Sequence, residues 1–92
     1  MRNIVLDIRS FDTKAALHQY LKEQLDFSDY YGENLDALYD ELTSSVEAIA
    51  LVLQYAAKPV GEMAEYLPRV LEVFRDAARE NYHLSVLLEE MA

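Results

Sequence analysis

The sequence predicts an α/β fold in which a small three-stranded parallel sheet is packed with about four helices. Strand-like segments lie near the start, the middle and the end of the 92-residue chain. Helix-like periodicity fills both intervals between them, so the predicted order is βααβααβ. Helical connections of this kind join parallel strands by right-handed crossovers. With a hydrophobic fraction of 52%, the chain can form a packed core, and we expect a single domain over 1–92.

The first strand is expected over 3–9, where apolar and polar side chains alternate. Asp12 or Thr13 can then cap a helix that ends near Gln24. Leucines recur at every fourth position of this helix and form its core-facing stripe. His18 lies on another face of this helix, and we interpret it as a surface residue with no special role.

The second helix begins near Asn34, after a loop over 27–32, and ends near Ser44. Gly32 permits a turn in this loop that a side chain would obstruct. The helix carries two stripes of side chains. The stripe that faces the core consists of Leu35, Leu38 and Leu42. The other stripe, at positions i, i+3, i+4 and i+7, consists of Asp36, Tyr39, Asp40 and Thr43.

The second half of the chain predicts a strand, two helical segments and a final strand. The middle strand is expected over 48–53, and its continuous apolar run predicts burial on both faces. A short helix within 56–67 is followed by a fresh start, with Pro68 at the first position of the last helix. Asn81 suits a left-handed stop to that helix. The last strand is expected over 83–88, with a second histidine at its edge.

The composition limits the class of protein. The 17 acidic and 8 basic residues give a net charge of −9, which repels nucleic acid and anionic membranes and attracts basic partners. The lack of cysteine excludes disulfides and thiolate metal sites and fits a reducing cytosol. No apolar run is long enough for a membrane span, and the N-terminal run is too short for a signal peptide. We therefore expect a cytoplasmic protein that binds neither nucleic acid nor membrane.

Asp36 and Asp40 are like charges one helical turn apart, an arrangement that destabilises a helix by about 0.2–0.5 kcal/mol. A solvated acidic face is the simplest interpretation of the pattern. The alternative is a face reserved for a positively charged partner, with Tyr39 between the carboxylates as an aromatic anchor. The pair has no neighbouring His or Lys, its spacing is not that of a calcium loop, and no phosphate-binding or nucleophile motif is present. We therefore expect no enzymatic activity, no cofactor and no metal site.

A second acidic stripe lies on the last helix, where Glu72, Asp76 and Glu80 recur every four residues. Arg75 and Arg79 occupy adjacent positions. The same pattern is typical of an exposed helix face that carries charges of both signs, so it leaves the role of Asp76 open.

The segment 30–40, Tyr-Tyr-Gly-Glu-Asn-Leu-Asp-Ala-Leu-Tyr-Asp, closely resembles the signature of the barstar family of ribonuclease inhibitors. The likeness continues in the first helix around 17–22, the middle strand at 51–53, the last helix at 70–77 and the last strand at 83–88. It therefore covers nearly the whole chain.

The resemblance implies an intracellular bacterial inhibitor, an immunity protein in the manner of a toxin–antitoxin pair. The implied partner is a basic, secreted, barnase-like ribonuclease with a preference for guanyl, bound one-to-one by a monomer. Asp40 matches the family's central carboxylate, which takes the place of the substrate phosphate, and Asp76 matches a Glu of a second acidic contact. The family inhibits with its second helix and the loop before it, which correspond here to Tyr30, Gly32, Asn34, Asp36, Tyr39, Asp40 and Thr43.

Two features differ from the family's usual pattern. The family usually has Trp at the position of Tyr39 and a bulky aromatic near Ser45, so apolar contact with a partner is reduced here. A barstar-like module that binds a different basic protein is therefore a second hypothesis. The segment over 56–68 is also shorter than in the family, which implies a reduced third helix.

Overall fold

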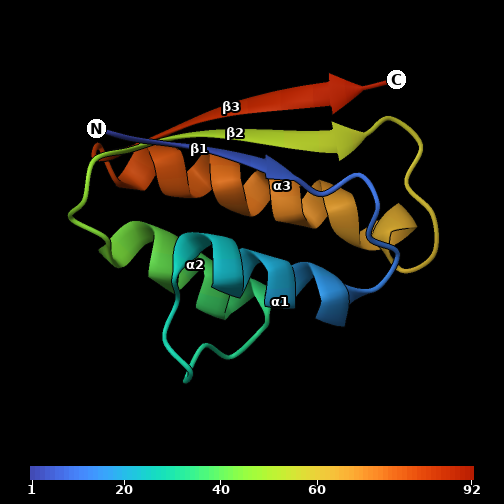
Figure 1. Ribbon diagram of the computed structural model, residues 1–92, viewed down its shortest axis with the longest axis horizontal. Helices are drawn as coiled ribbons and strands as arrows, with labels where there is room; N and C mark the ends of the chain where they lie inside the picture. Colours follow the sequence, from blue (N-terminus) through green and yellow to red (C-terminus); the bar gives the residue numbers. More distant parts are fainter.

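The computed structural model describes all 92 residues and contains one parallel sheet with helices packed on one of its faces (Figure 1). The strands are β1 (Arg2–Asp7), β2 (Ile49–Ala56) and β3 (Leu84–Met91), and the helices are α1 (Lys14–Leu25), α2 (Leu35–Ser44) and α3 (Met63–Glu80). The predicted α/β class and three-stranded parallel sheet are confirmed, but the helices number three rather than about four. None of these helices has the length and apolar character needed to cross a membrane.

The central strand is β2, which pairs in parallel with β1 on one side and with β3 on the other. The pairing follows from the connections, because α1 and α2 return the chain from β1 to β2, and α3 returns it from β2 to β3. The two ends of the chain consequently lie at opposite ends of the sheet, as Figure 1 shows.

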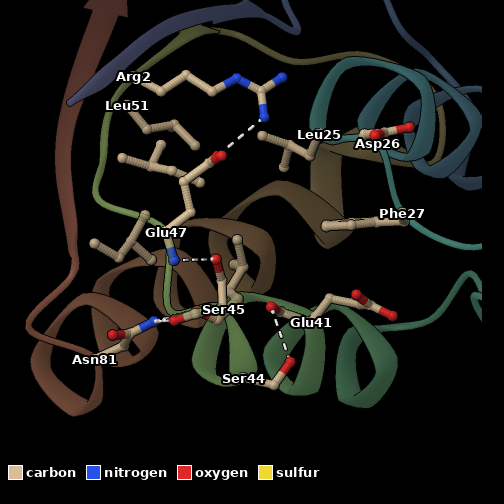
Figure 2. Close-up of a pocket in the computed structure, with 13 residues that line it drawn as sticks. Arg2, Leu25, Asp26, Phe27, Glu41, Ser44, Ser45, Glu47, Leu51 and Asn81 are labelled. Carbon is tan, nitrogen blue, oxygen red and sulfur yellow. Dashed lines mark hydrogen bonds and ion pairs between the residues drawn. The ribbon is translucent and has the colours of Figure 1, made fainter.

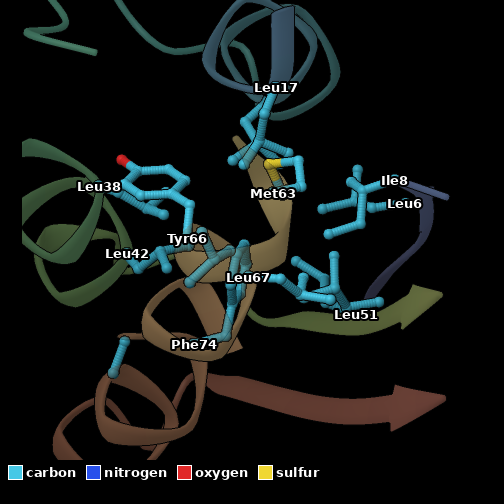
Figure 3. Packing of buried hydrophobic residues seen from close by; sticks show 14 of the residues in the cluster. Leu6, Ile8, Leu17, Leu38, Leu42, Leu51, Met63, Tyr66, Leu67 and Phe74 are labelled. Carbon is cyan, nitrogen blue, oxygen red and sulfur yellow. The ribbon is translucent and has the colours of Figure 1, made fainter. Parts of the chain in front are cut away.

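The core lies between the inner face of the sheet and the helices (Figure 3). It comprises 16 buried hydrophobic side chains. Leu6 and Leu53 enter it from the strands, and Val70 and Phe74 enter it from α3. Helix α2 packs against α3, with Leu38 among the fully buried residues. One side of α2 therefore faces the core and the opposite side faces solvent.

The prediction that the middle strand is buried on both faces is wrong. The outward-facing residues Val5, Val52 and Leu87 form a row across the sheet, because Val52 pairs with both of the others. Val5 is 60% exposed and Leu87 is 59% exposed. The sequence misleads here because the uncovered face carries apolar residues, so β2 reads as one continuous apolar run.

The prediction of a separate short helix before Pro68 is also wrong. A single helix, α3, runs from Met63 across the proline. Its first turn is held by a hydrogen bond from the Tyr66 amide to the Glu62 carbonyl at 3.1 Å. Met63, Tyr66 and Leu67 are all buried. Burial of these side chains offsets the hydrogen bond that Pro68 cannot donate within the helix.

Asn81 does not adopt the predicted left-handed conformation, because its φ of −121° is extended. Its buried side chain instead holds two segments together. Asn81 Nδ2 donates to the carbonyls of Leu42 and Ser45, at 2.9 Å each, and Oδ1 accepts from the His83 amide at 3.0 Å. Asn81 thereby joins the end of α3 to the end of α2 (Figure 2).

Candidate functional site

Helix α2 begins at a well-formed N-cap. Asn34 is extended, with φ −141°, and its Oδ1 accepts a hydrogen bond from the Ala37 amide at 2.8 Å. Its Nδ2 donates to the Gly32 carbonyl at 3.2 Å. An Asn cap of this kind satisfies a backbone donor that the helix itself leaves unpaired. The cap fixes where the acidic side of α2 begins.

The loop before α2 turns at Glu33 rather than at Gly32. Glu33 has a positive φ of 51°, whereas Gly32 does not adopt a left-handed conformation. A Cβ on Gly32 would lie 3.3 Å from Asn34 Nδ2 and 3.4 Å from the Ala37 Cβ. The glycine therefore provides space beside the helix cap, and a side chain there would crowd the capping amide.

Tyr30 and Tyr31 are neighbours with opposite environments. Tyr30 is 94% exposed, while Tyr31 is only 6% exposed and its ring lies 4.8 Å from that of Phe27. The Tyr31 amide donates to the Ser28 carbonyl at 3.0 Å. The buried tyrosine anchors the loop, and the exposed one is available to a partner.

The acidic side of α2 carries two unpaired carboxylates. Asp36 and Asp40 are both exposed, and neither belongs to any of the four ion pairs of the chain. Asp36 lies in the first turn, where the helix dipole stabilises an anion by about 0.3–1 kcal/mol. That gain is large enough to offset the repulsion between the pair, about 0.2–0.5 kcal/mol. Asp40 lies one turn later and gains little from the dipole, so its position is the less favourable one.

Tyr39 and Thr43 lie between the acidic side and the core. Tyr39 is half-buried and packs against the core cluster. The Thr43 hydroxyl donates to the Tyr39 carbonyl at 2.8 Å. Its hydrogen is already used within the helix, so Thr43 can offer a partner only an acceptor. Tyr39 offers a partner the exposed part of its ring and a hydroxyl that is not buried without a partner.

Asp76 stands apart from the other predicted site residues. It lies on α3, is about one-third exposed, and forms an ion pair with Arg79 one turn along the same helix. Its charge is therefore compensated, in contrast to Asp36 and Asp40. The structure groups the loop and α2 residues on one continuous segment, and it leaves Asp76 on a separate helix.

Two cations border the N-terminal end of the acidic side. Lys14 and Arg69 line an open hollow together with Glu33, Asp36 and the Tyr66 ring. Lys14 Nζ lies 5.1 Å from the centre of that ring, and Arg69 Cζ lies 5.9 Å from it. The end that carries Asp40 has no cation at ion-pairing distance. Of the two carboxylates, Asp36 lines the hollow that holds these cations and Asp40 does not.

A second hollow, of about 190 Å³, lies beside the C-terminal end of α2 (Figure 2). Arg2 and Glu47 form an ion pair at its rim, with Nη1 and Oε1 3.1 Å apart. Ser45 lines the hollow, and its Oγ accepts from the Glu47 amide at 3.2 Å. Sequence reasoning missed this feature because its walls come from four separate parts of the chain: Arg2, 25–27, 41–51 and 81–84.

His18 is not the surface residue that the sequence predicts. It is 1% exposed, with Nδ1 2.6 Å from the Tyr31 hydroxyl and Nε2 2.6 Å from the Tyr66 hydroxyl. Burial lowers the pKa of His18, and the negative charge of Glu33 opposes this effect. The available signal was its spacing, because His18 lies three residues before Leu21, on the buried side of α1.

Carboxylates fixed on a short, capped helix can accept charge-assisted hydrogen bonds from Arg, Lys or protonated His side chains of a partner. No group of three or more His, Asp or Glu side chains converges closely enough to hold a metal ion. The chemistry available to this surface is therefore the recognition of cations.

Comparison with known proteins finds a matching family and a similar curated protein. A sequence model of the family described as "Barstar (barnase inhibitor)" matches residues 1–89. The protein named "Putative ribonuclease inhibitor YrdF" from Bacillus subtilis (strain 168) is 44% identical over 81 residues, which cover 87% of this chain and 89% of that protein. The family match includes the loop before α2, the acidic side of α2 and Asp76. On these matches, the chain belongs to the barstar family, a family of ribonuclease inhibitors rather than enzymes.

Proposed function

We propose that this protein inhibits a barnase-like, guanyl-preferring ribonuclease by inserting the acidic side of α2 where the RNA phosphate would bind. The observation that carries this proposal is the pair Asp36 and Asp40, both exposed on a capped helix and both free of ion pairs within the chain. The family description as a barnase inhibitor supports it. The name of the Bacillus subtilis relative, "Putative ribonuclease inhibitor YrdF", supports inhibition of a ribonuclease but does not indicate which kind of ribonuclease is inhibited.

The chemistry of the target explains why carboxylates suit this role. A ribonuclease must present cationic side chains to the scissile phosphate, and a carboxylate accepts the same kind of hydrogen bonds from Arg, Lys and His. Because α2 is already folded and capped, its carboxylates lose little conformational freedom on binding. Opposite net charges also accelerate encounter between the two proteins.

We assign the central charge to Asp40 and a second charge to Asp36. Tyr30 and Tyr39 supply aromatic contacts, and Thr43 supplies a hydrogen-bond acceptor. Gly32 and Asn34 shape the loop that enters the interface. Asp76 acts as a second acidic contact only after it leaves Arg79, so we expect its contribution to be smaller than that of Asp40. The site residues are therefore Tyr30, Gly32, Asn34, Asp36, Tyr39, Asp40, Thr43 and Asp76.

The biological setting that fits is immunity. A basic, secreted bacterial nuclease is dangerous to the cell that makes it, and an acidic cytoplasmic inhibitor would protect that cell before export. The net charge of −9 supports a basic partner. We propose that a monomer binds one nuclease molecule, because a single acidic side of α2 suffices to fill one active site.

The test is inhibition of a barnase-like ribonuclease by three versions of the protein. Asp40→Ala should weaken binding by about a hundredfold or more, because the nuclease cations lose their buried partner. Glu90→Ala is the matched control, since Glu90 is an exposed carboxylate on β3, away from α2. The free energy of unfolding of both variants should equal that of the parent to within about 0.5 kcal/mol. Equal inhibition by Asp40→Ala and the parent would contradict the mechanism.

A second candidate function is recognition of a different basic protein through the same surface. The observation in its favour is Tyr39, which is half-buried against the core and offers a partner a smaller apolar area than an exposed aromatic would. Absence of inhibition, combined with binding of another basic protein that depends on Asp40, would support this candidate.

A further inference from the structure

Three aromatic rings from three different elements form a buried hydrogen-bonded chain. His18 belongs to α1, Tyr31 to the loop before α2, and Tyr66 to the first turns of α3. Each imidazole nitrogen lies 2.6 Å from one tyrosine hydroxyl. The ring centres are 5.7 Å apart for His18 and Tyr31 and 5.8 Å apart for His18 and Tyr66. None of these groups is needed to carry the charge of the proposed interface.

The chain of rings is connected directly to the loop that enters the proposed interface. Tyr31 lies between the exposed Tyr30 and Gly32, and its amide donates to the Ser28 carbonyl at 3.0 Å. The loop contains no helix or strand, so it is held by individual contacts, among them the Phe27–Tyr31 ring contact and the Asn34–Gly32 hydrogen bond. Fixing the Tyr31 ring therefore fixes the backbone on both sides of it.

We propose that His18 is a positioning residue for inhibition, whose neutral imidazole joins Tyr31 to Tyr66 and so holds the loop in its binding conformation. Protonation of the ring loosens the loop and weakens binding at mildly acidic pH. This inference rests on the proposed function, because it concerns the same surface.

The imidazole of His18 must be neutral if both of its hydrogen bonds to tyrosine are to form without an unpaired hydroxyl hydrogen. A neutral imidazole has one donor and one acceptor nitrogen, so one tyrosine donates to the ring and the other accepts from it. A protonated imidazole donates from both nitrogens. The hydroxyl that previously donated must then accept, and its hydrogen loses its partner in a buried environment. Tyr31 and Tyr66 therefore complete the hydrogen bonds of neutral His18 and disfavour its protonated form.

The charges around His18 come from every neighbouring element. Glu33 in the loop favours the cation, and Glu41 on α2 is close enough to act on Tyr31. Lys14 on α1 and Arg69 on α3 lie near the Tyr66 ring and oppose a further positive charge. Burial is the largest effect, and it lowers the pKa of His18.

The direction of the pH effect follows from this lowered pKa. An unfolded His titrates near 6.5, and the folded protein binds the proton less readily. The contribution of neutral His18 to the free energy of unfolding is therefore complete above about pH 6.5. It is lost as the pH falls toward the lowered pKa of His18 in the folded protein. Unperturbed Asp and Glu titrate near pH 4, so the window between about pH 5 and 6.5 reports mainly on histidine.

The first experiment uses the free protein, so it does not depend on any partner. Imidazole ¹⁵N shifts give the protonation state of His18, and hydrogen exchange gives the protection factor of the Tyr31 amide between pH 7.5 and 5. In the parent, the protection factor of the Tyr31 amide should fall by about threefold to tenfold as the pH is lowered, and the midpoint of this fall should match that of the His18 titration. His18→Gln, which keeps one donor and one acceptor but does not titrate there, should remove the pH dependence. A parent profile that is flat, or equal in His18→Gln, would overturn the proposal.

Tyr66→Phe provides a second variant in case His18→Gln does not fold. It removes one hydroxyl from the chain of rings, keeps the ring volume, and changes none of the proposed contact residues. Tyr82→Phe is its matched control, because Tyr82 is 90% exposed and is not a hydrogen-bond partner of His18. Tyr66→Phe should lower Tyr31 protection at pH 7.5, and Tyr82→Phe should not. Equal protection in both variants would contradict the positioning role.

The second experiment measures dissociation from a barnase-like ribonuclease at pH 7.5. Tyr66→Phe should dissociate about threefold to tenfold faster than Tyr82→Phe, because the loop is less well held. Asp40→Ala is measured beside them. If Asp40→Ala binds like the parent, the proposed function fails. If Asp40→Ala is weakened and Tyr66→Phe is not, only the positioning role of the His18 chain fails.

Discussion

Asp40 lies on the exposed side of α2, one turn after Asp36, and no Lys or Arg of the chain comes within ion-pairing distance of either residue. A helix that served only its own stability would place a cation at one of these positions. The carboxylate at position 40 therefore represents a small cost to the free protein. That cost is explained if a partner supplies the missing positive charge.

Asp40→Lys separates the two roles of this residue. Replacing the like-charge pair with an opposite-charge pair should raise the free energy of unfolding by about 0.4–1 kcal/mol, from lost repulsion and gained attraction together. The same change should abolish ribonuclease inhibition. Denaturant unfolding and an activity assay measure the two effects, with Asp40→Asn as the control that removes the charge without reversing it. If Asp40→Lys is less stable than the parent, repulsion between Asp36 and Asp40 does not destabilise the free protein as argued.

The burial of His18 and Asn81 could not be predicted from the residues near them in the sequence. Both are polar residues that the sequence places at the surface or in a turn, and both are buried. Their partners are distant in the sequence: Tyr66 lies 48 residues from His18, and Leu42 lies 39 residues from Asn81. Local periodicity carries no information about such contacts, because they form only when the helices pack together.

Helix α2 was predictable almost to the residue, whereas α3 was not. The cap, the leucine stripe and the acidic stripe of α2 all agree on one helix, and it runs from Leu35 to Ser44. In α3, Pro68 is a strong local signal for a helix start, but the burial of Met63, Tyr66 and Leu67 extends the helix in front of it. Tertiary packing overrides the local preference at that point.

The N-cap of α2 can be tested as an element. Asn34→Ala removes the acceptor for the Ala37 amide and should destabilise the protein by about 1 kcal/mol. Asn34→Asp keeps a capping oxygen and adds a charge that the helix dipole favours, so its stability should match or exceed that of the parent. Chemical denaturation measures both variants. Equal losses in the two would show that the cap does not set the stability of α2.

At the scale of the whole molecule, the site depends on the fold in two ways. Packing of α2 on α3 buries one side of the helix and leaves its acidic side in solvent, where the carboxylates stay unpaired. The net charge of −9 then surrounds that side with a negative potential. Composition alone indicated a basic partner, but only the structure separates free carboxylates from a paired one such as Asp76.

This charge predicts a strong effect of salt on association. The association rate constant with a basic, barnase-like ribonuclease should fall by about tenfold or more between low salt and about 0.5 M, as screening shortens the range of attraction. The dissociation rate should change much less, because the interface charges are then shielded from solvent. Stopped-flow fluorescence measures both rates. An association rate that is independent of salt would argue against electrostatic recognition.

In the proposed complex, α2 occupies the phosphate site of the nuclease. The most direct test is competition, in which the apparent dissociation constant of the complex is measured while guanosine 3′-monophosphate fills the active site of a barnase-like ribonuclease. If α2 and the nucleotide compete, the apparent dissociation constant should rise in proportion to the nucleotide concentration once the site is occupied. Asp40→Ala, which lacks the competing carboxylate, should bind weakly at every nucleotide concentration. Tight binding of the parent protein that stays unchanged at saturating nucleotide would contradict it.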